Sequence, residues 1–158
     1  MFLINIVIPG RKQYKFQHLL LDLNGTIAVD GKIIEGVKDR LYQLSQLINI
    51  CIITADTHGT AAKLEREIPI KIHKINCGEE KEQKRKMINQ LGNKNTISIG
   101  NGSNDVYMLR DSGLGICVLG REGAATEAVI NCDLLVQDIN DALDLLIEPS
   151  RLVATLRQ

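Results

Sequence analysis

The sequence predicts an α/β protein whose mainly parallel sheet carries helices on both faces, and two observations support this. From about residue 19 to residue 147, short apolar runs rich in β-branched residues alternate with longer amphipathic runs. The connections between runs are short, and right-handed crossovers then place helices on both faces of one sheet. We expect a Rossmann-like three-layer sandwich that takes up residues 1–158 as one domain.

Each strand is predicted from an apolar run that stops at small or polar residues. The expected strands span residues 19–23, 49–54, 70–75, 96–100, 115–119 and 134–136. Each helix is predicted from apolar residues at helical spacing, such as Val37, Leu41 and Leu44. The expected helices span residues 35–48, 58–67, 79–91, 104–112, 123–131 and 139–147.

The two ends of the chain and one loop are predicted separately. Residues 2–8 and 14–16 favour an added edge strand or a hairpin before the first sheet strand. Asp30-Gly31 lies between two apolar arms and favours a two-residue hairpin turn, because both residues tolerate positive φ. Residues 149–158 are expected to form a short packing helix with exposed arginines, with an interface role as the alternative.

Charge and composition exclude several classes of protein. The 19 Lys and Arg residues balance 19 Asp and Glu residues, so no excess charge attracts nucleic acid or an anionic membrane. No apolar stretch is long enough to cross a bilayer, and the first residues lack the features of a signal peptide. The four cysteines are scattered and form no CxxC pair, which predicts buried free thiols and a cytoplasmic location.

Polar residues gather where three of the predicted strands stop. These are residues 22–26 (DLNGT), 54–57 (TADT) and 100–105 (GNGSND). In open parallel sheets, ligands bind at the carboxyl ends of the strands, at the point where successive connections leave in opposite directions. We therefore expect a ligand site at this edge, with the strands that lead to Asp22 and Asn101 as neighbours.

Four ordered motifs carry a specific resemblance. LLLDLNGT with the hairpin IAVDGKII, then IITADT, a lysine within EEKEQKRKMINQLG, and ISIGNGSNDVYML resemble the motifs of the haloacid dehalogenase superfamily of phosphohydrolases. The chain resembles in particular the phosphorylation domain of P-type ATPases in its free-standing form, sometimes called soluble P-type ATPase-like. The resemblance covers residues 19–147 and implies a Mg²⁺-dependent phosphatase or phosphotransferase.

The resemblance implies roles for residues of the first two motifs. Asp22 would be the nucleophile that forms an aspartyl phosphate, and Gly25 and Thr26 would shape the loop around the phosphate. Thr54 would offer its hydroxyl, and the loop at Ala55 its amides, to the phosphoryl oxygens.

The last two motifs would supply the cation, the phosphate contact and the metal site. The family spacing selects Lys84 as the catalytic cation, whereas Lys81 and Lys86 are expected on a solvated helix face. Asn104 would contact the phosphate. The implied Mg²⁺ ligands are Asp22, the backbone carbonyl of Asn24, Asn101 and, directly or through water, Asp105.

Two amides stand where the family has acids. Asn24 replaces the Asp that acts as general acid and base, help that is worth about 10² to 10⁴ in rate, so slow hydrolysis is expected. Asn101 replaces a Mg²⁺-binding Asp, so lower metal affinity is expected. The alternative reading is a catalytically attenuated module of this fold that binds phosphate or a partner.

No cap domain fits within residues 23–53 or 55–83. Capless relatives leave the site open. The resemblance therefore implies either a large phosphorylated substrate, which can be a macromolecule, or a homo-oligomer in which a second subunit covers the site. We expect neither a nucleic acid nor a membrane as partner. Asp56, Arg121 and Glu122 are expected at the surface, with a place at the site as the alternative.

Overall fold

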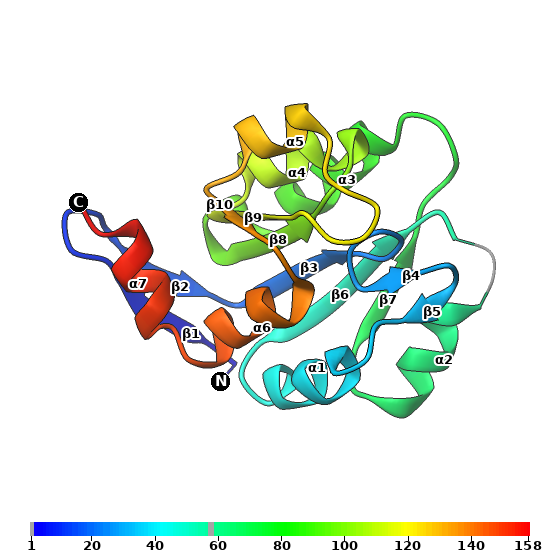
Figure 1. Cartoon of the computed structure of the whole chain (residues 1–158), viewed down its shortest axis with the longest axis horizontal. Coiled ribbons are helices and arrows are strands. Elements are labelled where there is room, and N and C mark those ends of the chain that lie inside the picture. The colour runs from blue at the N-terminus through cyan, green and yellow to red at the C-terminus, as the bar shows by residue number, and fades with distance from the viewer. Residues whose placement is uncertain (1, 57–58) are drawn as a thin grey trace.

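The computed structural model describes residues 2–56 and 59–158, and its centre is a six-stranded parallel sheet (Figure 1). The strand order is β10-β9-β8-β3-β6-β7. The strands are β3 (His18–Asp22), β6 (Asn49–Thr54), β7 (Lys71–Lys74), β8 (Thr96–Gly100), β9 (Leu114–Val118) and β10 (Leu134–Val136). The predicted α/β class is confirmed, and β3 and β8, which lead to Asp22 and Asn101, are neighbours as expected.

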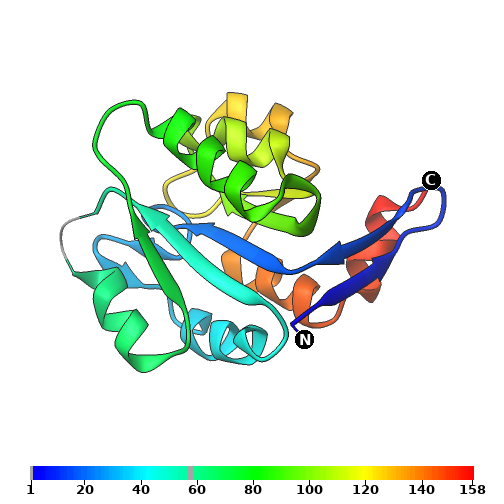
Figure 2. The same ribbon diagram turned by 180° about the vertical axis from the view of Figure 1, so that it is seen from behind.

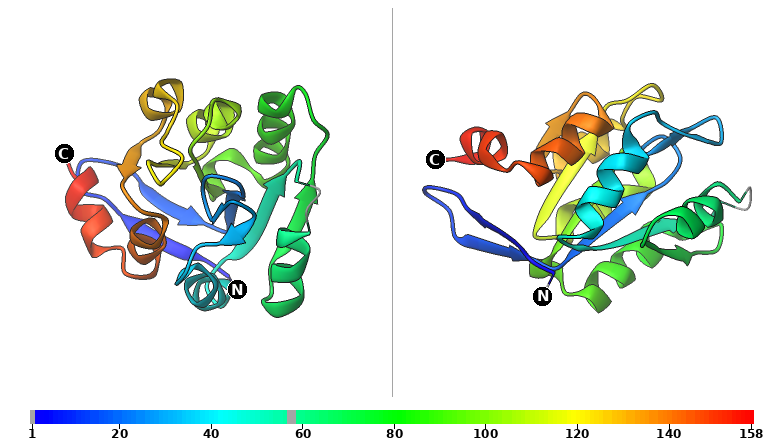
Figure 3. Two further views of the ribbon diagram at one scale, coloured as in Figure 1. Left: turned by 45° about the vertical axis from the view of Figure 1, so that its right-hand side comes forward. Right: turned by 90° about the horizontal axis from the view of Figure 1, so that it is seen from below.

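Helices cover both faces of the sheet, which gives the three layers seen in the left view of Figure 3. One face carries α1 (Val37–Ser45), α2 (Thr60–Glu67) and α6 (Ile139–Ile147). The opposite face carries α3 (Glu80–Leu91), α4 (Val106–Asp111) and α5 (Thr126–Asn131). Single 3₁₀ turns span Asn93–Asn95 and Ser103–Asp105.

The central strand β3 shows why this sequence forms a sheet between two helical layers. Leu19 and Leu21 point into the core shared with α1 and α6, while Leu20 packs with residues of α3 and α4. All three leucines are fully buried. A strand buried on both faces has no polar face, which explains the uninterrupted apolar run in the sequence.

The predicted boundaries differ from the observed ones mainly at helix starts. Three strands match residue for residue, and the others shift by one residue at either end. The helices predicted over 104–112 and 123–131 are shorter, because residues 103–105 form a 3₁₀ turn and α5 begins only at Thr126. His58, the first residue of the helix predicted over 58–67, lies outside the described residues.

Two antiparallel pairs stand outside the main sheet. β1 (Ile4–Val7) and β2 (Gln13–Phe16) form a hairpin, so of the two alternatives for this segment the hairpin is confirmed. β4 (Ala28–Val29) and β5 (Lys32–Ile33) flank the predicted turn, in which Asp30 and Gly31 have φ of 52° and 74°. Both values match a turn that needs positive φ at its two central residues.

The last helix, α7 (Ser150–Leu156), lies against the β1-β2 hairpin at one side of the molecule (Figures 1 and 2). Its arginine Arg151 is exposed and Leu152 is fully buried, as predicted for a packing helix. The prediction of buried thiols is wrong for Cys77, which is exposed, while Cys117 is buried and all four cysteines are free. Within the described ranges, no helix has both the length and the apolar character needed to cross a membrane.

Candidate functional site

The three polar strand ends lie together at the carboxyl edge of the sheet. Asp22 is the last residue of β3, Thr54 ends β6 and Gly100 ends β8. β3 lies between β6 and β8. The helix α1, which joins β3 to β6, and the helix α3, which joins β7 to β8, cover opposite faces of the sheet. The edge is therefore the topological switch point at which open parallel sheets bind ligands.

Lys84 joins the first motif to the last. Its Nζ donates to Asp22 Oδ1 at 2.8 Å and to Asp105 Oδ1 at 2.7 Å, and its side chain is 1% exposed. Lys84 lies one turn into α3, and it shares the buried side of that helix with Met87 and Ile88. The family motif that selected Lys84 places apolar residues three and four positions after it, and this spacing turns its side chain toward the strand ends.

Burial and the second carboxylate shape the electrostatics of this cluster. Burial first, and then the nearby Asp105, raise the pKa of Asp22 to about 7, although Lys84 and the Thr26 hydroxyl favour the ionised form. Burial lowers the pKa of Lys84, but the combined attraction of Asp22 and Asp105 outweighs it, so the net pKa is raised. Lys84 is therefore a permanent cation beside a carboxylate that gives up its proton near neutral pH.

The loop after β3 is held by Thr26. Its Oγ1 donates to Asp22 Oδ2 at 3.0 Å and also lies 3.3 Å from Asn101 Oδ1. Gly25 has φ +80° and its N–H donates to the carbonyl of Ala28 at 2.8 Å, which closes the tight turn. A side chain at Gly25 would overlap Asn101, so this position combines a backbone and a space requirement that favour glycine.

Asp105 organises the loop after β8. Its Oδ2 accepts from the backbone N–H groups of Asn101 and Gly102, each at 2.9 Å, while Oδ1 faces Lys84. Asp105 is fully buried, and a side chain at Gly100 would overlap it. Both of its oxygens are engaged, so Asp105 positions Lys84 and the loop here, and its expected role as metal ligand stays a prediction.

A cavity of about 250 Å³ opens in front of Asp22. It is lined by Asp22, Asn24, Thr54, Ala55, Asp56, Glu80, Lys84 and Asn104. Thr54 Oγ1 accepts from the backbone N–H of Asp56 at 2.9 Å, which leaves the hydroxyl proton able to donate into the cavity. Six of the predicted site residues thus share one cavity, and Asp56 lines it as well.

Gly25, Thr26 and Asn101 do not line this cavity, and Thr26 contacts Asp22 through Oδ2 rather than through the Oδ1 that faces Lys84. Asp22 Oδ2 and Asn101 Oδ1 both face the Thr26 hydroxyl, so a carboxylate and an amide oxygen converge there. Within residues 2–56 and 59–158, no three His, Cys, Asp or Glu side chains group to hold a metal. Mg²⁺ takes one or two carboxylates and keeps several waters, so this donor set fits Mg²⁺ rather than a metal that needs a full protein cage.

Sequence reasoning missed one acid at the site, Glu80, and gave a second, Glu122, a place there only as an alternative. Glu80 lines the cavity from the start of α3, where the only signal was an acid in the first turn of a predicted helix. Glu122 was expected at the surface, and it is exposed, yet its Oε2 lies beside Gly25 in the space that a side chain there would need. No spacing rule links residue 122 to residue 25, because only the folded chain brings them together.

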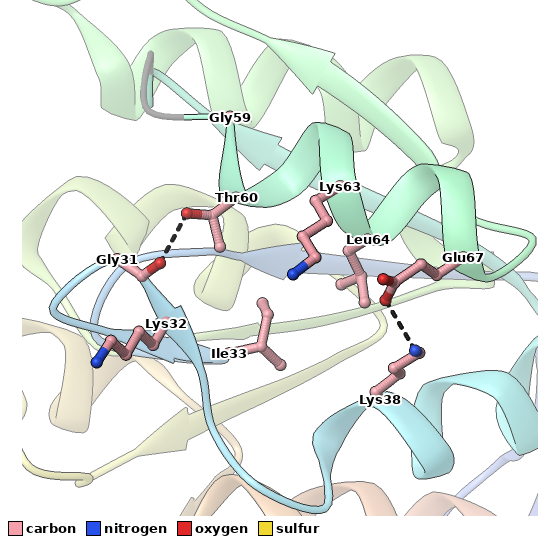
Figure 4. A pocket seen from close by; sticks show the side chains of 9 residues that line it. All are labelled: Gly31, Lys32, Ile33, Lys38, Gly59, Thr60, Lys63, Leu64 and Glu67. Carbon is pink, nitrogen blue, oxygen red and sulfur yellow. Dashed lines mark hydrogen bonds and ion pairs between the residues drawn. The ribbon is translucent and has the colours of Figure 1, made fainter.

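A larger cavity of about 420 Å³ lies away from these residues, between the β4-β5 hairpin and α2 (Figure 4). Thr60 Oγ1 donates to the carbonyl of Gly31 at 2.9 Å, and Lys38 pairs with Glu67 at 2.8 Å across its lower rim. None of the residues predicted for the site lines this cavity. The chemistry-bearing side chains therefore gather in the smaller cavity at the strand ends.

Comparison with known sequences finds relatives in one archaeon. No family model matches the chain. It is 46% identical over 92 residues to an uncharacterised protein of Methanocaldococcus jannaschii. The aligned region covers 56% of this chain and 99% of that protein. It is 27% identical over 123 residues to a soluble P-type ATPase-like phosphatase of the same organism, which covers 76% of this chain and 45% of that relative. The chain thus spans less than half of the phosphatase.

Comparison with solved structures extends over most of the chain. A HAD superfamily (subfamily III A) hydrolase from Legionella pneumophila superimposes with a TM-score of 0.68 and 18% identity, over 89% of this chain and 88% of that one. A 3-deoxy-D-manno-octulosonate 8-phosphate phosphatase from Moraxella catarrhalis, solved with magnesium, phosphate and its sugar, gives 0.66 and 18%, over 89% and 90%. At these identities the likeness concerns the fold.

Proposed function

The chain has the fold of the haloacid dehalogenase (HAD) superfamily of hydrolases, and from this premise we propose that it is a magnesium-dependent phosphohydrolase or phosphotransferase that acts through Asp22. The observation that carries the proposal is the buried cluster in which Lys84 bonds Asp22 and Asp105, with Asp22 facing an open cavity. An ion pair that served only to stabilise the fold would not require an open cavity beside it at the switch point of the sheet. The sequence relative described as a phosphatase supports the same assignment.

The residues at the cavity have the roles that phosphoryl transfer requires. The Asp22 carboxylate attacks phosphorus, an Asp–O–P bond forms, and the bond from phosphorus to the leaving oxygen breaks. Lys84 and the Thr54 hydroxyl stabilise negative charge on the transferring phosphoryl oxygens, and both line the cavity beside Asp22. Water, or another acceptor, then takes the phosphoryl group from Asp22.

Magnesium, when bound, would neutralise charge shared by Asp22 and the phosphate. Asp22 Oδ2 and Asn101 Oδ1 are the side-chain oxygens that converge at Thr26, and the backbone carbonyl of Asn24 belongs to the same loop. The solved neighbour with bound magnesium and phosphate supports this choice of metal. Asp105 contributes by holding the backbone at Asn101 in place.

Asn24 sets the expected rate and substrate class. It is exposed and lines the cavity, but an amide exchanges no proton with the leaving oxygen or with water. General acid and base help is worth about 10² to 10⁴ in rate, so substrates with good leaving groups are favoured. We propose acyl or aryl phosphates as the first substrates to test, on a site open enough for larger phosphorylated molecules.

The test is phosphate release from acetyl phosphate and from p-nitrophenyl phosphate, with and without Mg²⁺, by the native chain, Asp22→Asn and Asn24→Asp. We expect slow Mg²⁺-dependent release, its loss in Asp22→Asn, and faster release in Asn24→Asp because the carboxyl group restores proton transfer. Mass spectrometry of the acid-quenched native chain should find one phosphoryl group on Asp22. If native chain and Asp22→Asn release phosphate equally slowly, the chain is instead a phosphate- or partner-binding module of this fold.

A further inference from the structure

The turn after β9 holds an acid against the site. Gly120 and Gly123 have φ of +50° and +73°, and the N–H of Gly123 donates to the carbonyl of Gly120 at 3.3 Å. This four-residue turn presents Arg121 and Glu122 at its tip. Positive φ at both ends of the turn favours glycine at these two positions, which fixes the conformation of the turn.

The same turn is tied to Asn101. Asn101 Nδ2 donates to the carbonyl of Gly123 at 3.1 Å, and the N–H of Ala125 donates to the carbonyl of Asn101 at 2.9 Å. These two bonds connect the turn to the loop that follows β8. Glu122 Oε2 therefore lies beside Asn101 and Gly25 because the turn is anchored there, on the side of Asp22 where the metal ligands converge.

The charges around that point are unbalanced for a divalent cation. With both carboxylates ionised, Asp22, Asp105 and Lys84 together carry one negative charge, and Asn24 and Asn101 carry none. Glu122 makes no ion pair with any described residue, since no Lys, Arg or His nitrogen lies within 4 Å of its carboxylate. Its charge is thus available to the site.

We propose that Glu122 is a positioning residue for Mg²⁺, a carboxylate that supplies from the β9 turn the charge that Asn101 does not. The proposal rests on the magnesium site of the proposed function. An exposed carboxylate beside the metal ligands acts on the ion through the water molecules that Mg²⁺ retains. Residues that act on a metal in this way typically change its affinity by about 10- to 100-fold when they are replaced.

The test measures metal binding in the absence of substrate. Binding of Mn²⁺, followed by the loss of the free-ion EPR signal, and its displacement by Mg²⁺ are measured for the native chain, Glu122→Gln and Glu148→Gln. Glu148 is an exposed acid between α6 and α7, so its replacement removes the same charge elsewhere. We expect about tenfold weaker binding in Glu122→Gln and native binding in Glu148→Gln.

A rescue variant separates this role from a merely structural one. Asn101→Asp places a carboxylate among the metal ligands themselves, so Glu122→Gln should cost less affinity in the Asn101→Asp chain than in the native chain. Equal binding by native chain and Glu122→Gln, no binding by the native chain, or an equal loss in both backgrounds would overturn the proposal. The binding measurement uses no substrate. Its result therefore does not depend on whether the chain releases phosphate.

Discussion

At the scale of single residues, Lys84 is the position where sequence and structure agree most closely. Three lysines lie within one helical stretch, and the spacing of the resembled family motif selected Lys84. In the structure Lys84 is 1% exposed between two carboxylates, Lys86 is exposed, and Lys81 pairs with Glu127 at 3.3 Å. Removing the Lys84 cation leaves the two buried carboxylates unpaired, so replacing this residue tests the ion pairs directly.

Replacing Lys84 by methionine should destabilise the fold. The change leaves the buried carboxylates of Asp22 and Asp105 without their cation, which costs about 3 to 5 kcal/mol for a buried pair. Urea unfolding at pH 8, where Asp22 is ionised, measures the difference, with Lys86→Met as the matched control because that lysine is exposed on the same helix. Equal stability of the two variants would contradict the ion-pair assignment.

The raised pKa of Asp22 predicts how stability depends on pH. The folded chain keeps a proton on Asp22 up to about pH 7, whereas the unfolded chain releases it near pH 4. The folded state therefore binds more protons between these values, and the contribution of Asp22 to the free energy of unfolding falls as pH rises from about 4 to about 7. Lys84 stays protonated throughout, because its pKa is raised.

Asp22→Asn isolates this contribution. Urea unfolding of both chains is measured at intervals from pH 4 to pH 8. The free energy of unfolding of the native chain should fall relative to that of the variant up to about pH 7, and the difference should then level off. Mg²⁺ is left out of these solutions, since a bound cation favours the ionised carboxylate. A pH-independent difference would show that Asp22 titrates normally.

At the scale of elements, close packing between α4 and β9 positions the last motif. α4 follows directly after Asp105, and Gly115 on β9 faces the backbone carbonyl of Leu109 so closely that a Cβ atom would overlap it. The backbone of the helix can therefore approach the strand only where glycine stands. This contact, rather than helix propensity, decides where α4 lies relative to β8 and β9.

Gly115→Ala should push α4 away from the sheet. Overpacking of this kind costs about 1 to 3 kcal/mol, and the shift is transmitted to Asp105 at the start of the helix. We expect lower stability in urea unfolding together with slower phosphate release. Gly78→Ala is the control, because its Cβ would meet no atom within 4 Å and its cost is limited to the positive φ of 85°. Unchanged phosphate release in a less stable Gly115→Ala would contradict the coupling.

At the scale of the whole molecule, both ends of the chain close one side of the core. Leu152 of α7 packs with Ile6, Phe16 and Leu114, and these residues belong to the same buried cluster as Leu19 and Leu21. The N–H of Gln158 donates to the carbonyl of Pro9 at 3.0 Å, which joins the C-terminus to the turn of the β1-β2 hairpin. The hairpin and α7 thus share the core of the sheet.

Leu152→Ala tests whether residues 1–158 fold as one domain. Loss of a buried leucine costs about 2 to 5 kcal/mol. If the core is continuous, circular dichroism and tyrosine fluorescence should show one common urea transition at a lower midpoint, while Mn²⁺ binding stays native. Arg151→Ala, an exposed neighbour on the same helix, should leave the midpoint unchanged. Two separate transitions would contradict the single-domain prediction.

The sequence by itself determined the α/β class, the approximate strands and helices, and the three strand ends that meet at one edge. These features follow from local periodicity and from the rule that parallel strands present their carboxyl ends together, so neighbouring residues carry the signal. The choice of Lys84 among three lysines came instead from the family resemblance, whose motif places apolar residues three and four positions after the catalytic lysine.

Only the tertiary structure decided the rest. The position of Glu122 beside Gly25, the place of the β1-β2 hairpin outside the sheet, and the exposure of Cys77 depend on contacts between segments far apart in the chain. The raised pKa of Asp22 likewise needs its burial and the approach of Asp105. Packing and desolvation act through space, and no local pattern of residues encodes them.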